Sequence, residues 1–145
     1  MSVEIVIRNA GKRVSLRNLK RTAERALKFL RQGQAELSLA LVGNQEIRKL
    51  NARYRKKNRP TDVLSFPQEG NLPTGQKLLG DVVISVEQAA RQARKRGRRL
   101  RREIEDLMIH GILHLLGYDH ERSSRAAKIM REMEREIQRF VRKRH

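Results

Sequence analysis

The 145-residue chain contains no cysteine. Disulfide bonds, cysteine-based zinc ribbons, iron–sulfur clusters and thiol nucleophiles are therefore excluded. Tryptophan is also absent and only two tyrosines and three phenylalanines occur, which disfavours RNA-binding modules that depend on aromatic stacking. No apolar run approaches the roughly 20 residues that span a bilayer, and Glu4 and Arg8 interrupt the apolar N-terminal segment. These absences predict a soluble cytoplasmic protein without a membrane segment or a secretory signal.

Acidic residues are scarce relative to basic ones. Lys and Arg total 34 against 16 Asp and Glu, which gives a formal net charge of +18. Such a surface gains affinity for polyanions by releasing their condensed counterions, so nucleic acid is the first partner to consider and an anionic membrane surface the second. Because 24 of the basic residues are arginine, a generally arginine-rich proteome is the alternative explanation. The clustering of the charge favours nucleic acid.

The basic residues concentrate in two stretches of the sequence. Eight of the twelve positions in 91–102 are basic, and a second run contains Arg139, Arg142, Lys143 and Arg144. Contacts with phosphates fix the position of a nucleic acid but carry little information about its bases. These stretches therefore predict salt-sensitive RNA binding with weak sequence specificity. The alternative is that they form solvated helix surfaces.

Hydrophobic periodicity predicts the element order β-α-β-α-β-β-α-α-α. Strands are expected near 3–7, 37–41, 61–67 and 78–85, and helices near 15–33, 44–54, 86–95, 100–116 and 124–142. Ser15, Asn44 and Ser85 are predicted to cap the first three helices. We therefore expect a single domain over residues 1–145, of α+β class, in which a mixed four-stranded sheet packs on about five helices.

Three of the four histidines fall in the segment HGILHLLGYDH at 110–120. His110 and His114 lie four residues apart in a helical pattern, so both imidazoles project from one face and can share a metal ion. Gly117 can end this helix in a left-handed conformation, and the reversed chain can return His120 to the open side of the pair. Three imidazoles around Zn²⁺ leave a fourth position for water, as in catalytic sites. The spacing therefore predicts one metal ion, for which zinc is favoured among the divalent ions.

The histidine spacing resembles that of the metzincin peptidases, H-E-x-x-H-x-x-G-x-x-H, and predicts a metzincin-like zinc helix. In those enzymes the glutamate after the first histidine is the general base, whereas Gly111 holds that position here. A metallopeptidase is therefore disfavoured unless Asp119 or Glu121 replaces the missing base. Asp119 has two further interpretations: it orients a ligand imidazole, or it is a turn residue after the helix.

Three segments of the sequence resemble the YbeY family of bacterial zinc-dependent endoribonucleases and rRNA maturation factors. They are HGILHLLGYDH, YRKKNRPTDVLSFP at 54–67 and LGDVVIS at 79–85. The resemblance implies a single-strand-directed endoribonuclease that acts in 16S rRNA 3′-end maturation and ribosome quality control. It also implies His110, His114 and His120 as ligands of one Zn²⁺ ion, and Arg55 as the functional basic residue.

The same resemblance implies single-stranded rRNA and the small ribosomal subunit as partners. A ribosomal protein or an assembly GTPase is the expected protein partner, no membrane is involved, and the chain is expected to be a monomer. A zinc-containing ribosome-assembly factor without enzymatic activity is the main alternative. On the residues alone Arg55 competes with four basic neighbours, and only the resemblance singles it out. These neighbours are Arg53, Lys56, Lys57 and Arg59.

Overall fold

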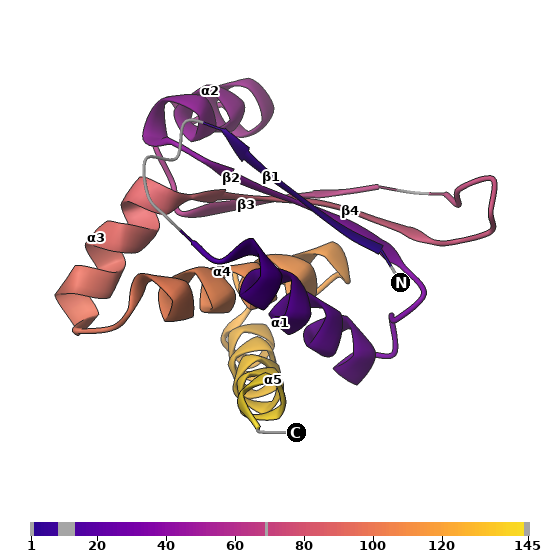
Figure 1. Ribbon diagram of the computed structural model, residues 1–145. Coiled ribbons are helices and arrows are strands. Elements are labelled where there is room, and N and C mark those ends of the chain that lie inside the picture. The colour runs from indigo at the N-terminus through magenta and orange to yellow at the C-terminus, as the bar shows by residue number, and fades with distance from the viewer. Residues whose placement is uncertain (1, 9–13, 69, 144–145) are drawn as a thin grey trace.

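The computed structural model describes residues 2–8, 14–68 and 70–143, so position 144 of the second basic run lies outside the described residues. The elements follow the predicted order (Figure 1). They are β1 (Ser2–Arg8), α1 (Leu16–Phe29), β2 (Glu36–Val42), α2 (Asn44–Arg55), β3 (Val63–Pro67), β4 (Leu78–Ser85), α3 (Val86–Arg96), α4 (Leu100–Leu115) and α5 (Ser124–Arg142). The predicted α+β class, with four strands and five helices in the described part of the chain, is confirmed.

The strands form one mixed sheet in the order β1-β2-β4-β3. β1, β2 and β4 run parallel, whereas β3 pairs with β4 in the antiparallel direction. Most side chains of the central strand β4 are buried, which explains why its sequence reads as an almost continuous apolar run. β3 is an edge strand, and Pro67 ends it at a position where a missing backbone N–H is tolerated.

Helices cover both faces of the sheet (Figure 1). α1, α4 and α5 lie on one side, where Leu19, Leu39 and Met108 belong to the main hydrophobic core. α2 lies on the other side, where Ile47 packs in a smaller cluster with Leu64. The edge strand β3 therefore has α4 on one face and the end of α2 near the other.

α4 is the central helix of the protein. Ten of its 16 residues are buried, and it contacts β3, β4, α1, α3 and α5. A helix that is apolar over most of its circumference is typical of a core position. The histidines of α4 are therefore carried by the most firmly packed helix of the fold.

The predicted N-caps are confirmed at two of the three helices. The Ser15 hydroxyl accepts a hydrogen bond from the N–H of Asn18, and that of Ser85 accepts one from the N–H of Gln88. The prediction for Asn44 is wrong, because Gly43 is the cap and Asn44 is the first helical residue. The Asn44 amide oxygen instead accepts a hydrogen bond of 2.6 Å from the Ser85 hydroxyl, which occupies the side chain that would have capped the helix.

Gly111 allows α4 to approach the sheet closely. A Cβ atom at this position would lie 2.6 Å from a methyl group of Val82 and 3.1 Å from the Ser65 hydroxyl. The Ser65 hydroxyl also donates a 2.9 Å hydrogen bond to the Gly111 carbonyl, which ties β3 to α4. No larger side chain fits here without moving the helix away from β4.

Replacing Gly111 with alanine should lower the free energy of unfolding by up to about 2 kcal/mol. Alanine gains about 1 kcal/mol of helix propensity, but overpacking costs about 1–3 kcal/mol and the β-branched Val82 cannot rotate away easily. Denaturant titration of the metal-free protein measures the change. In a Val82→Ala background the same substitution should cost less, because the clash is gone. An equal cost in both backgrounds would contradict the packing argument.

Candidate metal centre

The two helical histidines face each other across one turn of α4. The Nε2 atoms of His110 and His114 lie 3.1 Å apart. Residues four apart lie one above the other on a helix, which is the arrangement predicted for this pair. Both side chains are partly buried, so their rings are held by the surrounding structure rather than free in solvent.

The chain reverses direction at Gly117, where φ is 97°. The N–H of Gly117 donates to the carbonyl of His114, and the N–H of Tyr118 donates to that of Leu113. These two bonds form the Schellman arrangement that ends many helices at a left-handed glycine. The reversal returns the chain over the histidine pair, so that Nδ1 of His120 lies 3.1 Å from Nε2 of His114.

The three imidazoles fit a metal ion. One nitrogen from each of His110, His114 and His120 lies within 4.8 Å of the other two, which makes this group capable of holding a metal ion. Ligand distances of about 2.0–2.1 Å in a tetrahedral centre put neighbouring nitrogens about 3.3 Å apart, close to the observed 3.1 Å. His120 is exposed, so the group opens to solvent on its side.

The environment of His114 favours the neutral imidazole. Burial lowers its pKa, and the neighbouring His110 and His120 lower it further. A backbone hydrogen bond at Tyr118 and the charge of Asp119 act in the opposite direction on this pKa. Because only the neutral ring offers a lone pair to a metal, the net lowering reduces competition from protons.

The histidines open into a cleft of about 980 Å³ along the edge strand β3. α2 contributes Tyr54 and Arg55 to its wall, and the segments that follow α2 and α4 contribute Lys57 and Glu121. The Arg55 guanidinium lies 3.8 Å from the Glu121 carboxylate, and both side chains are largely exposed. The structure therefore brings Arg55 to the same cleft as the three histidines.

The structure separates Arg55 from most of its basic neighbours. Arg55 and Lys57 line the cleft, whereas Arg53 lies over the face of Tyr54 at 5.3 Å. Lys56 adopts a left-handed conformation with φ of 57°, which turns the chain directly after Arg55. Neither Lys56 nor Arg59 is among the residues that line the cleft.

Asn51 holds this basic connector in place. Its backbone carbonyl accepts hydrogen bonds from the N–H groups of Lys56 and Lys57. Its buried amide nitrogen donates a 2.9 Å bond to the carbonyl of Arg59. Three hydrogen bonds therefore fix the segment that follows α2, although this segment contains three basic residues, Lys56, Lys57 and Arg59.

Two acidic residues considered as catalytic substitutes have local partners. The Asp119 carboxylate accepts a 2.9 Å hydrogen bond from the backbone N–H of Glu121, as a turn residue does. Glu121 faces Arg55 across the cleft. The position after His110 remains closed, because Gly111 is packed against Val82.

The sequence model of the family described as Endoribonuclease YbeY matches residues 4–142 of the chain. The chain belongs to the YbeY family. A relative named Endoribonuclease YbeY from Aquifex aeolicus is 47% identical over 130 residues, which cover 90% of this chain and 86% of the relative. A second, from a Sulfurihydrogenibium species, is 44% identical over 127 residues, covering 88% and 84%.

A solved structure supports the same relationship. The solution structure of TM1509 from Thermotoga maritima is 33% identical and covers 94% of this chain and 88% of its own. The TM-score between the two is 0.65. The YbeY family membership predicted from three short segments is therefore confirmed over nearly the whole chain.

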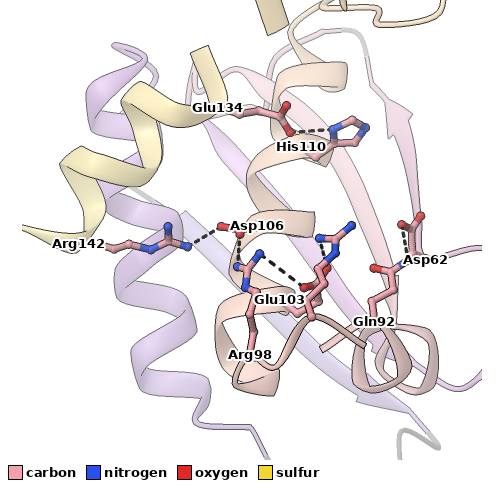
Figure 2. A network of polar contacts seen from close by, with 9 residues as sticks. Asp62, Gln92, Arg98, Glu103, Asp106, His110, Glu134 and Arg142 are labelled. Atoms are coloured by element: carbon pink, nitrogen blue, oxygen red, sulfur yellow. Dashed lines mark hydrogen bonds and ion pairs between the residues drawn. The ribbon is translucent and has the colours of Figure 1, made fainter. Parts of the chain in front are cut away.

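Glu134 is a site residue that the sequence analysis missed. Its carboxylate accepts a 2.9 Å hydrogen bond from Nδ1 of His110 (Figure 2). The other nitrogen of this ring, Nε2, lies 3.1 Å from Nε2 of His114. A carboxylate in this position fixes the ring orientation of a metal ligand and raises its basicity. Glu134 belongs to α5 and lies 24 residues from His110, so no local spacing indicated the contact.

Replacing Glu134 with alanine should weaken metal binding by about 10–100-fold, because the His110 ring loses its orienting acceptor. The metal affinity of Glu134→Gln should lie between those of the wild type and Glu134→Ala, since an amide oxygen still accepts the hydrogen bond but carries no charge. Competition against a metal-binding dye measures the affinity. Glu136→Ala, which removes an exposed carboxylate from the same helix, is the matched control. Equal affinities for Glu134→Ala and the control would refute the assignment.

Part of the first basic stretch has an internal role. Arg96 and Arg98 form ion pairs with the buried Glu103, at 3.1 and 3.7 Å, and Arg98 also pairs with Asp106 (Figure 2). Asp106 pairs in addition with Arg142 on α5. These arginines connect α3, α4 and α5, so the expectation that the whole stretch faces RNA needs revision.

In residues 2–8, 14–68 and 70–143, no helix combines the length and apolar character needed to cross a membrane.

Proposed function

We propose that this protein is a zinc-dependent endoribonuclease that cuts single-stranded RNA. The observation that carries the proposal is the opening of the His110, His114 and His120 group into the cleft that Arg55 lines. Membership of the YbeY family, whose relatives are named endoribonucleases, supports the same activity. Three imidazole ligands favour zinc, and three protein ligands are typical of a catalytic rather than a structural zinc site.

Each part of the cleft has a task in such a reaction. A zinc ion held by the three imidazoles would supply Lewis acidity at a phosphodiester oxygen. Arg55 can hold the phosphate through two parallel hydrogen bonds and stabilise its growing negative charge. Its present contact with Glu121 is long and exposed, at 3.8 Å, so a phosphate can replace the carboxylate as its partner. Lys57 adds a second positive charge to the cleft wall.

The proposed substrate is rRNA of the small ribosomal subunit in the cytoplasm. The YbeY resemblance supports a role in 16S rRNA 3′-end maturation and ribosome quality control, with a ribosomal protein or an assembly GTPase as protein partner. We propose that the chain acts as a monomer. The net charge of +18 supports an RNA partner independently of the family.

The two alternative functions have less support. A metallopeptidase needs a general base after the first histidine, and Gly111 has no room for a side chain there. A structural zinc site usually has four protein ligands. Among the described residues, the group that could hold a metal consists of three histidines, one fewer than a structural site usually has, and His120 is exposed to solvent.

Elemental analysis combined with three matched substrates tests the proposal. We expect about one zinc ion per chain and cleavage of a single-stranded RNA, but not of the same sequence in an RNA duplex or as single-stranded DNA. Zinc without any RNA cleavage would favour the non-enzymatic assembly factor. Cleavage of a peptide substrate that depends on the metal would favour a peptidase.

A further inference from the structure

Three adjoining hollows lie around Arg142, near the C-terminal end of α5. One is bounded by the start of α4, the second by the last two turns of α5, and the third by α1. Arg142 lines all three, so they form one continuous surface, called here the Arg142 surface. Among the described residues, Glu105 and Asp106 are the acidic residues that line it, against ten basic ones.

Both acidic residues are already neutralised by internal partners. Glu105 is buried, accepts a 2.8 Å hydrogen bond from Thr22 and lies 3.8 Å from Arg101. Asp106 pairs with Arg98 and Arg142. The remaining positive charge of the Arg142 surface is therefore available to an external anion.

Several basic side chains of this surface have no ion-pair partner in the structure. Arg99, Arg102, Arg139 and Lys143 are all exposed, and no carboxylate of the described residues lies within 4.0 Å of their charged groups. Arg142, in contrast, is held by Asp106. The surface thus combines one fixed guanidinium with a surrounding group of exposed, unpaired cations.

The catalytic cleft carries much less positive charge. Its lining contains Arg55 and Lys57 but also the carboxylates of Asp62, Asp119 and Glu121. A cleft with this balance orients a phosphate, whereas strong salt-dependent affinity for a polyanion requires many unpaired cations. The net charge of +18 must therefore act mainly outside the cleft.

We propose that the Arg142 surface is a second RNA-binding site, which holds the phosphodiester backbone of the substrate outside the catalytic cleft without reading its bases. The proposal rests on the proposed function only in taking RNA as the polymer. The planar guanidinium of arginine can donate two parallel hydrogen bonds to the oxygens of one phosphate. None of the exposed large hydrophobic residues (Ile7, Leu16, Tyr54 and Ile129) lines the surface, so it lacks the apolar side chains with which a membrane-surface helix inserts.

The position of the surface allows one RNA to reach both sites. Arg102 and His110 lie eight residues apart on α4, which corresponds to about 12 Å along the helix axis at 1.5 Å per residue. A long strand that leaves the cleft can therefore continue onto the Arg142 surface. An RNA of only a few nucleotides, bound in the cleft, does not extend that far.

Charge reversal at two positions tests the inference. We expect Arg102→Glu/Arg139→Glu to weaken binding of an oligouridine of about 30 nucleotides at least about tenfold at low salt, and to reduce the slope of log K against log salt by about two. Binding is measured with a chelator present to prevent cleavage. The kcat/KM for an oligouridine of about six nucleotides should change by less than about twofold.

The matched control is Lys49→Glu/Lys77→Glu, which reverses two exposed charges that line neither the cleft nor the Arg142 surface. Equal loss of RNA binding in both double variants would overturn the inference, because binding would then depend on the total charge of the protein and not on this surface. Unchanged RNA binding with reduced binding to phosphatidylserine vesicles would also overturn it. If the wild type binds the long RNA at this surface but cuts no RNA, the inference stands and the proposed nuclease activity fails.

Discussion

Replacing His114 with alanine is expected to abolish metal binding and RNA cleavage together. The His114 Nε2 lies 3.1 Å from a ring nitrogen of His110 and 3.1 Å from one of His120, so both other histidines converge on it. Two imidazoles alone do not complete the three-ligand set of a catalytic zinc site. Cleavage should fall by at least about 10³-fold, because the metal contributes several kcal/mol of charge stabilisation. Elemental analysis and cleavage of a single-stranded RNA check both parts.

Comparison of metal-free proteins separates loss of the site from loss of the fold. With a chelator present, the free energies of unfolding of wild type and His114→Ala should agree within about 1 kcal/mol, because the side chain is only partly buried. Added zinc should then stabilise the wild type and leave the variant unchanged, since only the wild type binds it tightly. A variant that retains stoichiometric zinc and full cleavage would remove His114 from the metal centre.

Replacing Arg55 with glutamate is expected to lower kcat/KM for RNA by about 10²–10³-fold while zinc content stays unchanged. Loss of a hydrogen-bond donor that stabilises developing charge has an effect of this size. Arg55 does not contact the histidines through any ion pair or hydrogen bond of the structure; its partner is the exposed Glu121 at 3.8 Å. An exposed ion pair contributes at most about 1 kcal/mol, so the melting temperature should hardly change.

Two neighbouring variants make the Arg55 test specific. Arg53→Glu introduces the same change of charge on the same helix, but Arg53 does not line the cleft, so its effect on kcat/KM should be small. Arg55→Lys keeps the positive charge but loses the planar guanidinium group. Its kcat/KM should therefore lie between those of the wild type and Arg55→Glu. If Arg53→Glu and Arg55→Glu lower cleavage equally, the effect is one of overall charge.

The parts of the site that sequence reasoning predicted depend on local geometry. The spacing of His110 and His114 is a property of any helix, and Gly117 ends this helix through hydrogen bonds confined to 113–118. His120 follows Gly117 by three residues, so its return to the histidine pair could also be predicted from the local sequence. The order of strands and helices was predicted for the same reason, because each hydrophobic period is contained within its own element.

The parts that sequence reasoning missed depend on contacts between distant elements. Glu134 reaches His110 only because α5 packs on α4. The sequence analysis assigned no role to Glu103 or Glu105, yet both are buried. Glu103 forms ion pairs with arginines that precede α4, and Glu105 accepts a hydrogen bond from Thr22 on α1. Asn44 was wrongly predicted as a cap because its partner, Ser85, lies 41 residues away. The sequence pattern within one segment contains no information about partners that lie in distant segments.

The contact between Glu134 and His110 also sets an order of events during synthesis of the protein. A ribosome releases the chain from its N-terminus, so the three histidines emerge before α5 and its carboxylate. Until α5 docks on α4, the His110 ring lacks the acceptor that orients it. The three histidines therefore reach their full affinity for a metal only after α5 has folded. An RNA-cleaving protein that is synthesised by an RNA-based ribosome thus completes its active site only after a segment 24 residues beyond His110 has emerged.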